Sequence, residues 1–443
     1  MSTQQSADGN SHDALVQSLG ISPLRGHLEP LKTKGEIRAS HELINVYVIE
    51  LPARAANAVL SLLRTALPPD PSPTDLQHLR RVIKPSFLPA PALAHLAPTR
   101  VAAPPSAGET RLLLVCPISQ IPAPDLESLL LAHPPFKRAT PPASDREETP
   151  DTSFPLKLHV LPVPALAPTS APQAESWSAT FWPVAYKHTN PFGPHPALVA
   201  RAAAEVAPRA GAWLALAEEA ARQGVERGIG VGVGAVVVER PLDANGRAKV
   251  QEARCVAVAG DGRACGVGSA DCTPGNVMAH AAMRAIGMVA LKRVRLEEAA
   301  GKMGGGGGEE KEAGDGKPSR ECCDPVEDVF AVRPRTNVEE EWFKREDNLA
   351  PNGYLCVDLE IYLTHEPCVM CSMAILHSRF NRAVFARRMP RSGGLTADER
   401  GLGHGLFWRP VELNWKFLTW EFVREGDDDG DEKTLEIHEG LNA

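Results

Sequence analysis

The second half of the chain reads as alternating helices and strands. Apolar and β-branched runs predict strands over residues 228–239, 256–260, 354–364 and 382–386. Helical spacing of apolar residues predicts helices over 197–224, with a break or kink at Pro208, and over 277–296, with a short helix from Cys368. The first two strands are expected to pair across the polar turn 243–246. This order predicts an α/β domain, a central mixed sheet with helices on its faces.

The first half gives a weaker pattern and predicts a smaller α+β domain. Strands are expected over 44–51, 111–116 and 156–163, with helices over 53–67 and 125–132. Of the 40 prolines, 30 lie between Pro23 and Pro196, which places a domain boundary near residue 190. We therefore divide the chain into a disordered N-terminus over 1–35, a proline-rich domain over 36–190 and the α/β domain over 191–425.

Charge is uneven along the 443 residues, whose net charge is −8. Residues 297–328 carry −6 and residues 425–439 carry −7, so the rest of the chain carries +5. Both acidic segments have the composition of solvated chain, which predicts a low-complexity insert over 297–350 and an acidic tail over 426–443. The mildly basic remainder is compatible with an RNA partner.

Membrane and secretory classes are disfavoured. The chain has no apolar run long enough to span a bilayer, and its first 30 residues are polar and acidic rather than signal-like. We expect an intracellular protein without a membrane partner. Nine cysteines in such a chain are more typical of thiols or metal ligands than of a disulfide framework.

One pair of cysteines is a candidate for a metal site or a redox site. Cys368 and Cys371 follow a predicted strand and open a predicted helix, where the helix dipole and free N–H groups favour thiolates. Alone, this spacing fits a redox pair, a structural zinc site or chance. His280 opens the other helix, 88 residues earlier, and only 34 residues separate it from Cys368 when the insert is left out. We therefore expect His280, Cys368 and Cys371 to form a zinc site whose fourth coordination position is open.

These residues resemble the signature H-x-E followed by P-C-x-x-C of the zinc nucleoside deaminases. The flanks Tyr354-Leu355-Cys356, 364–368 (THEPC) and 372–379 (SMAILHSR), and the segment 401–420, resemble the accessory subunit of the eukaryotic tRNA wobble-adenosine deaminase. The resemblance covers roughly residues 190–425. It implies the cytidine-deaminase-like fold, bound Zn²⁺, a heterodimer with a catalytic subunit whose His-x-Glu motif is intact, tRNA as a further partner, and a location in the nucleus or the cytoplasm.

The chain departs from the signature at its proton shuttle, because Ala282 stands where the glutamate belongs. Alanine cannot transfer a proton, and Glu366 is a poor substitute because active relatives also have a carboxylate before the motif's proline. Loss of a general acid and base costs about 10²- to 10⁴-fold in rate. We expect an inactive chain with no catalytic residue of its own, which contributes to tRNA A-to-I editing as a non-catalytic subunit with a structural zinc.

Two other hypotheses stay open at this point. One is an active zinc deaminase that uses a displaced carboxylate, and the other is a zinc scaffold without an RNA substrate. If RNA is bound, short basic clusters in the first domain are the candidate phosphate contacts. They comprise Arg80, Arg81 and Lys84, and Lys137 with Arg138.

Overall fold

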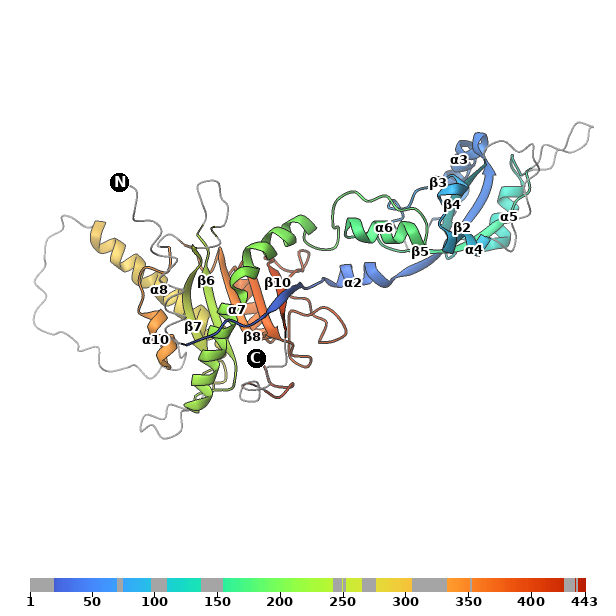
Figure 1. Ribbon diagram of the computed structural model, residues 1–443. Coiled ribbons are helices and arrows are strands. Elements are labelled where there is room, and N and C mark those ends of the chain that lie inside the picture. Colours follow the sequence, from blue (N-terminus) through green and yellow to red (C-terminus); the bar gives the residue numbers. More distant parts are fainter. Residues whose placement is uncertain are drawn as a thin grey trace, which may run out of the picture. The chain divides into compact units, whose positions relative to one another are not determined.

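Two sheets organise the chain (Figure 1). The computed structural model describes residues 20–69, 75–96, 110–136, 154–241, 249, 252–264, 276–304, 333–350, 353–425, 435 and 437–443. The described residues up to Lys34 and from Ala197 onward form one compact unit, here called the six-stranded unit. Residues 35–196 form the other, the four-stranded unit. The expected turn 243–246 lies outside the described residues.

The six-stranded unit has a mixed sheet in the order β1-β10-β9-β8-β6-β7. Strands β8, β9 and β10 run parallel to one another, and the pairs β1–β10, β8–β6 and β6–β7 are antiparallel. Its elements are β1 (Gly26–Pro30), α7 (Pro196–Glu226), β6 (Gly234–Glu239), β7 (Arg254–Gly260), α8 (Ala281–Gly304), α10 (Asn337–Phe343), β8 (Leu359–His365), α11 (Val369–His377), β9 (Arg382–Arg387) and β10 (Leu418–Arg424).

Helices cover both faces of this sheet. One apolar cluster joins α8 and α11 to side chains of β6, β7, β8 and β9. The other joins α7 to the opposite face, where Trp213 and Trp420 are completely buried. A mixed sheet between helical layers confirms the predicted α/β class.

The edge strand β1 corrects our expectation of disorder over residues 1–35. Its residues Gly26–Pro30 pair with Arg424–Trp420 of β10, so the dark blue strand lies beside the red one in Figure 1. The pairing is antiparallel and long range, and a five-residue strand with one partly buried leucine gives little local signal. The prediction of disorder was wrong because β1 is stabilised by its pairing with β10, which is distant in the sequence.

Two helices also differ from expectation. Helix α7 runs unbroken through Pro208, which lies on its exposed side, so the carbonyl that loses its hydrogen bond there can face water. Within the predicted low-complexity insert, α8 extends to Gly304 and α10 contributes Trp342, which is completely buried. Those parts of 297–350 therefore belong to the fold.

Two predicted strands begin later than their apolar runs. Strand β6 starts at Gly234 and β8 at Leu359. Before β8, Leu355 and Asp358 have positive φ values of 50° and 64°, which strand residues do not adopt. Turn geometry thus replaces strand over residues 355–358.

The four-stranded unit has an antiparallel sheet in the order β3-β4-β2-β5. This order is that of a ferredoxin-like sheet, and the β-α-β-β-α-β succession of that fold carries one extra helix between its second and third strands and another after its last strand. Helices α4 and α6 pack on one face and α3 and α5 on the other. Its elements are α2 (Lys34–His41), β2 (Leu43–Pro52), η1 (Ala53–Ala55), α3 (Ala56–Ala66), β3 (Val82–Ile83), η2 (Pro85–Phe87), α4 (Ala90–Leu96), β4 (Thr110–Pro117), α5 (Ala123–Leu131), β5 (Leu158–Pro164) and α6 (Ala171–Thr180).

In the described part of the chain, no helix is both long enough and apolar enough to cross a membrane.

Candidate metal centre

Two helix starts bring the predicted ligands together. His280 directly precedes α8, and Cys368 is the N-cap residue of α11, one turn before Cys371. Strand β8 ends at His365 and delivers the short Glu366-Pro367 link to α11. Because helix N-termini present unpaired N–H groups and a partial positive charge, both are suited to hold thiolates and a metal.

The three side chains form the one His, Cys, Asp or Glu group in the described residues that could hold a metal ion. His280 Nδ1 lies 3.7 Å from Cys368 Sγ and 3.4 Å from Cys371 Sγ, and all three residues are buried. Tetrahedral zinc with ordinary bond lengths separates nitrogen and sulfur ligands by about 3.5 Å. The donor set and its spacing therefore fit zinc.

The two thiols titrate as a pair. A hydrogen bond from the Cys371 thiol lowers the pKa of Cys368, and His280 acts in the same direction. The same bond raises the pKa of Cys371, and burial raises it further. Cys368 therefore loses its proton more readily than Cys371. The resulting negative charge lies at the start of α11, where a metal cation would bind.

Among the described residues, the group that could hold a metal ion contains no carboxylate. Ala282 is 3% exposed and packs in the apolar cluster beneath α8. Glu366 is buried too, and its oxygens accept the backbone N–H groups of Met389, Leu395 and Thr396 at 3.2, 3.1 and 2.7 Å. Glu366 is therefore a structural clamp on the loop after β9.

Main chain from residues 441–443 lies against the ligands. The Cys368 N–H donates to the Ala443 oxygen at 3.0 Å, and that oxygen is 3.4 Å from His280 Nδ1. Ser392 and Arg263 donate to the carbonyls of Leu441 and Asn442. Ala443 is buried, so this end of the predicted solvated tail 426–443 packs in the fold, which corrects that expectation.

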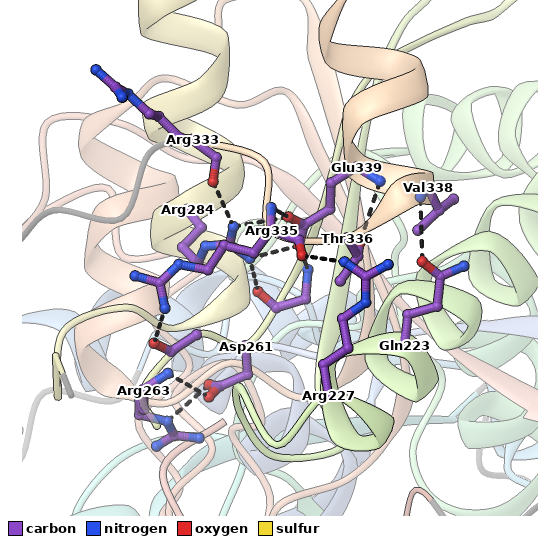
Figure 2. Close-up of polar contacts among 12 residues, drawn as sticks. Gln223, Arg227, Asp261, Arg263, Arg284, Arg333, Arg335, Thr336, Val338 and Glu339 are labelled. Carbon is purple, nitrogen blue, oxygen red and sulfur yellow. Dashed lines mark hydrogen bonds and ion pairs between the residues drawn. The ribbon is translucent and has the colours of Figure 1, made fainter. Parts of the chain in front are cut away.

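A buried ion pair fixes the start of α8 (Figure 2). Arg284, one turn after His280, makes two hydrogen bonds to the Glu339 carboxylate of α10, at 2.6 and 2.9 Å. Glu339 also accepts the N–H groups of Gly260 and Arg335. Next to it, Asp261 pairs with Arg263, whose Nη1 lies 3.4 Å from His280 Nε2.

No local sequence pattern identifies Arg263, Arg284 or Glu339 as neighbours of the metal ligands. Arg263 and Arg284 look like ordinary surface cations, and Glu339 lies in an acidic run. The bidentate partner of Arg284 is 55 residues away, and the Ala443 contact to His280 spans 163 residues. An apolar pair four residues apart, Val338 and Trp342, was the one available sign that α10 packs on the core.

The candidate RNA contacts lie in the four-stranded unit. Arg80 and Lys84 line a groove beside β3. The Arg81 side chain instead points inward and donates to the Val115 carbonyl at 2.7 Å, and burial lowers its pKa. Lys137 and Arg138 lie outside the described residues.

A buried His-Cys-Cys cluster at two helix starts, on a mixed sheet covered by helices, is the arrangement of the zinc-dependent nucleoside deaminases. Among curated proteins, the chain is 45% identical over 67 residues to the tRNA-specific adenosine deaminase subunit tad3 of Schizosaccharomyces pombe, covering 15% of this chain and 19% of that protein. It is 61% identical over 44 residues to the subunit TAD3 of Saccharomyces cerevisiae, covering 10% and 14%. These relatives confirm the predicted resemblance to the accessory deaminase subunit.

The human relative is named a probable inactive tRNA-specific adenosine deaminase-like protein 3, and is 36% identical over 72 residues, covering 16% of this chain and 18% of that protein. The chain thus spans less than a fifth of the length of these three relatives. No family model matches it. A solved structure from studies of A-to-I editing by tRNA:A34 deaminases is 20% identical, covers 47% of this chain and 95% of that one, and has a TM-score of 0.24.

Proposed function

We propose that this chain is the non-catalytic subunit of a heterodimeric deaminase that converts adenosine to inosine at the wobble position of tRNA anticodons. The observation that carries the proposal is a complete His-Cys-Cys cluster with Ala282 two residues after His280. The relatives named as subunits, and as probable inactive proteins, support it.

Hydrolytic deamination needs a group that removes a proton from water and returns it to the base and the leaving amine. In this chain, Ala282 has no titratable group and Glu366 is held by three N–H donors. The Ala443 oxygen also accepts the Cys368 N–H at 3.0 Å and lies 3.4 Å from His280 Nδ1, so main chain occupies space directly beside the ligands. Catalysis therefore falls to a partner with an intact His-x-Glu motif.

A bound zinc would supply ligand bonds that tie the start of α8 to the start of α11. His280 Nδ1 and the two sulfurs would hold it, and Arg284 with Glu339 would keep α8 in position. The six-stranded unit would then present a fixed surface to the partner. The four-stranded unit would help bind and orient tRNA.

Inosine formation measured with and without the partner tests the proposal. We expect no inosine in tRNA from this chain alone, none or little from the partner alone, and full activity when the two are co-expressed. Inosine formed by this chain alone would instead favour an active deaminase with a displaced carboxylate. A chain that copurifies with neither a second deaminase nor tRNA would favour the zinc scaffold.

Zinc binding has a separate test with a matched control. Cys371→Ser removes a ligand, whereas Cys356→Ser removes a buried thiol outside the cluster. We expect metal analysis to find one zinc per chain in the wild type and in Cys356→Ser, and none in Cys371→Ser, with a large loss of stability. Equal zinc content in all three proteins would contradict the assignment of the ligands.

A further inference from the structure

One carboxylate on α10 holds two neighbouring segments of the fold (Figure 2). Glu339 is 0% exposed and accepts hydrogen bonds from both terminal nitrogens of Arg284, in the first turn of α8, at 2.6 and 2.9 Å. It also accepts the Gly260 N–H at 2.7 Å, at the end of β7, and Arg284 donates to the Gly260 carbonyl at 2.6 Å. The start of α8, the end of β7 and α10 therefore meet at one ion pair.

This contact supports the backbone on both sides of His280. Four residues after His280, the Arg284 N–H donates to the His280 carbonyl at 2.9 Å. Two residues after Gly260, the Gly262 N–H donates to the carbonyl of Ala279, the residue directly before His280, at 2.8 Å. The position of the imidazole therefore depends on α10, although α10 contributes none of the three candidate ligands.

Helix α8 in turn holds α10 in place. The seven residues of α10 are too few for a helix that is stable by itself in water. Lys292, about two turns after Arg284 on α8, is buried and donates to the Trp342 carbonyl at 2.6 Å, near the end of α10. Arg284 and Lys292 thus fasten Glu339 and Trp342 to α8. Docking of α10 therefore depends on the position of α8.

A zinc ion held by His280, Cys368 and Cys371 would restrain the start of α8 as well, because it would tie that helix to α11. Two contacts that restrain one segment share the entropic cost of ordering it, so each contact strengthens the other. Linkage makes the effect reciprocal. Docked α10 then raises the zinc affinity by the same factor by which zinc stabilises the docked position of α10.

We propose that α10 is an outer support of the metal centre, and that its docking through Glu339 and the binding of zinc at His280, Cys368 and Cys371 strengthen each other. The inference rests on the proposed function in one respect, that the cluster binds zinc. Helix α10 lies between α8 and α11 in the sequence, so the segment that separates the ligands controls how tightly they hold the metal. A partner that displaces α10 lowers the zinc affinity.

Zinc affinity tests the proposal directly. The full chain, as wild type and as Glu339→Gln, competes with a chromophoric chelator for Zn²⁺, and the dissociation constant of each protein is measured. Glutamine keeps the size of the side chain but removes the charge that holds Arg284. We expect Glu339→Gln to bind zinc at least about fivefold more weakly, which is the lower end of typical couplings between two sites in one protein.

Two controls separate the coupling from a general loss of stability. Glu340→Gln changes the next residue of α10, whose carboxylate is exposed and pairs with Lys344. Glu360→Gln removes another buried carboxylate, which pairs with Arg240 near the start of β8, whereas Cys368 lies beyond the end of that strand. Both variants should bind zinc as the wild type does.

Hydrogen exchange of the wild-type chain with and without Zn²⁺ tests the same coupling without a substitution, and decides the question if Glu339→Gln does not fold. Zinc should slow exchange of the α10 amides at least about fivefold, by reciprocity with the change in affinity. Strand β1 is the internal reference, because it lies at the opposite edge of the sheet from β7, which α10 contacts. Exchange in β1 should be unchanged.

Failure of the coupling and failure of the zinc site give different results. Equal zinc affinity of Glu339→Gln and the wild type, or α10 exchange that zinc leaves unchanged, would overturn the coupling while the zinc site stands. Equal weakening by Glu339→Gln and Glu360→Gln would overturn it too, because zinc affinity would then follow the stability of the whole unit. A wild-type chain that binds no zinc would overturn both the coupling and the zinc site of the proposed function.

Discussion

The metal cluster joins residues 88 positions apart in the sequence, because the fold brings the start of α8 to the start of α11. These three ligands could be predicted from the sequence, because His280 lies in the first turn of one predicted helix, and Cys368 and Cys371 lie in the first turn of another. Arg263 and Ala443 reach the same cluster from loops, without a local pattern. Their roles follow from tertiary contacts alone.

Ala282→Glu restores the missing carboxylate but leaves the Ala443 main chain beside the ligands. We expect no inosine from the isolated Ala282→Glu chain, because the Ala443 main chain still lies against His280 and Cys368. Ala282→Gln, similar in size but uncharged, is the control for packing. Mass spectrometry of nucleosides from treated tRNA provides the measurement, and inosine from Ala282→Glu alone would show that the carboxylate was the sole deficit.

His365 predicts how stability depends on pH. Burial lowers its pKa to about 3, and Arg387 acts in the same direction. The unfolded histidine has a pKa of about 6.5, so the unfolded chain binds a proton that the folded chain excludes, and stability falls as the pH drops from about 6.5 toward 3.

Urea unfolding at pH 7, 6 and 5 measures this dependence, and His365→Asn should flatten it in the six-stranded unit. His78 provides a comparison in the four-stranded unit, where burial also lowers the pKa of the imidazole. Hydrogen exchange read separately in the two units distinguishes them. A His365→Asn protein with the wild-type pH slope in the six-stranded unit would contradict the prediction.

Among the helices and strands, the periodicity of apolar residues located most elements. Predictions from amino-acid composition were wrong where residues of polar or helix-breaking type lie in elements that pack on the core. Residues 297–350 looked solvated because they are rich in acids and glycine, yet α10 within them buries Trp342 and Glu339. Pro208 predicted a break in α7, but a proline on the exposed side leaves the buried side intact. Both errors have the same cause. The type of residue was used for the prediction, whereas the face of the helix on which the residue lies decides its effect.

The Arg284–Glu339 ion pair predicts how much one acidic residue of segment 297–350 contributes to the stability of the fold. Glu339→Gln leaves the Arg284 guanidinium buried without its counter-charge, which should cost about 3 to 5 kcal/mol of unfolding free energy. Its neighbour Glu340 is 53% exposed and pairs with Lys344, so Glu340→Gln should cost under about 0.5 kcal/mol. Urea denaturation of both variants measures the difference; equal losses would argue against a buried ion pair.

At the scale of the whole molecule, the sequence located two domains but assigned the first segment wrongly. Proline content placed a boundary near 190, and the compact units divide at Pro196 and Ala197. The strand β1 could not be assigned from sequence, because it joins a sheet whose other strands begin more than 200 residues later. The four-stranded unit is thus inserted between β1 and α7.

Disrupting β1 should therefore weaken the six-stranded unit rather than the four-stranded unit, which follows β1 directly in the sequence. Leu28→Asp places a charge where the side chain packs against the α7 cluster, and should speed hydrogen exchange in β10 while leaving β2 and β4 unchanged. Glu29→Gln, at the exposed neighbouring position, is the control. Faster exchange in the four-stranded unit alone would contradict the pairing.

The β1–β10 pairing also sets an order of events during synthesis. Strand β1 leaves the ribosome early, but its partner begins roughly 390 residues later, a delay of about 20 to 80 s at ordinary elongation rates. The four-stranded unit is complete long before that and can fold first. For all of this interval β1 lacks its partner strand, so the nascent chain exposes unpaired backbone N–H and C=O groups until translation reaches β10.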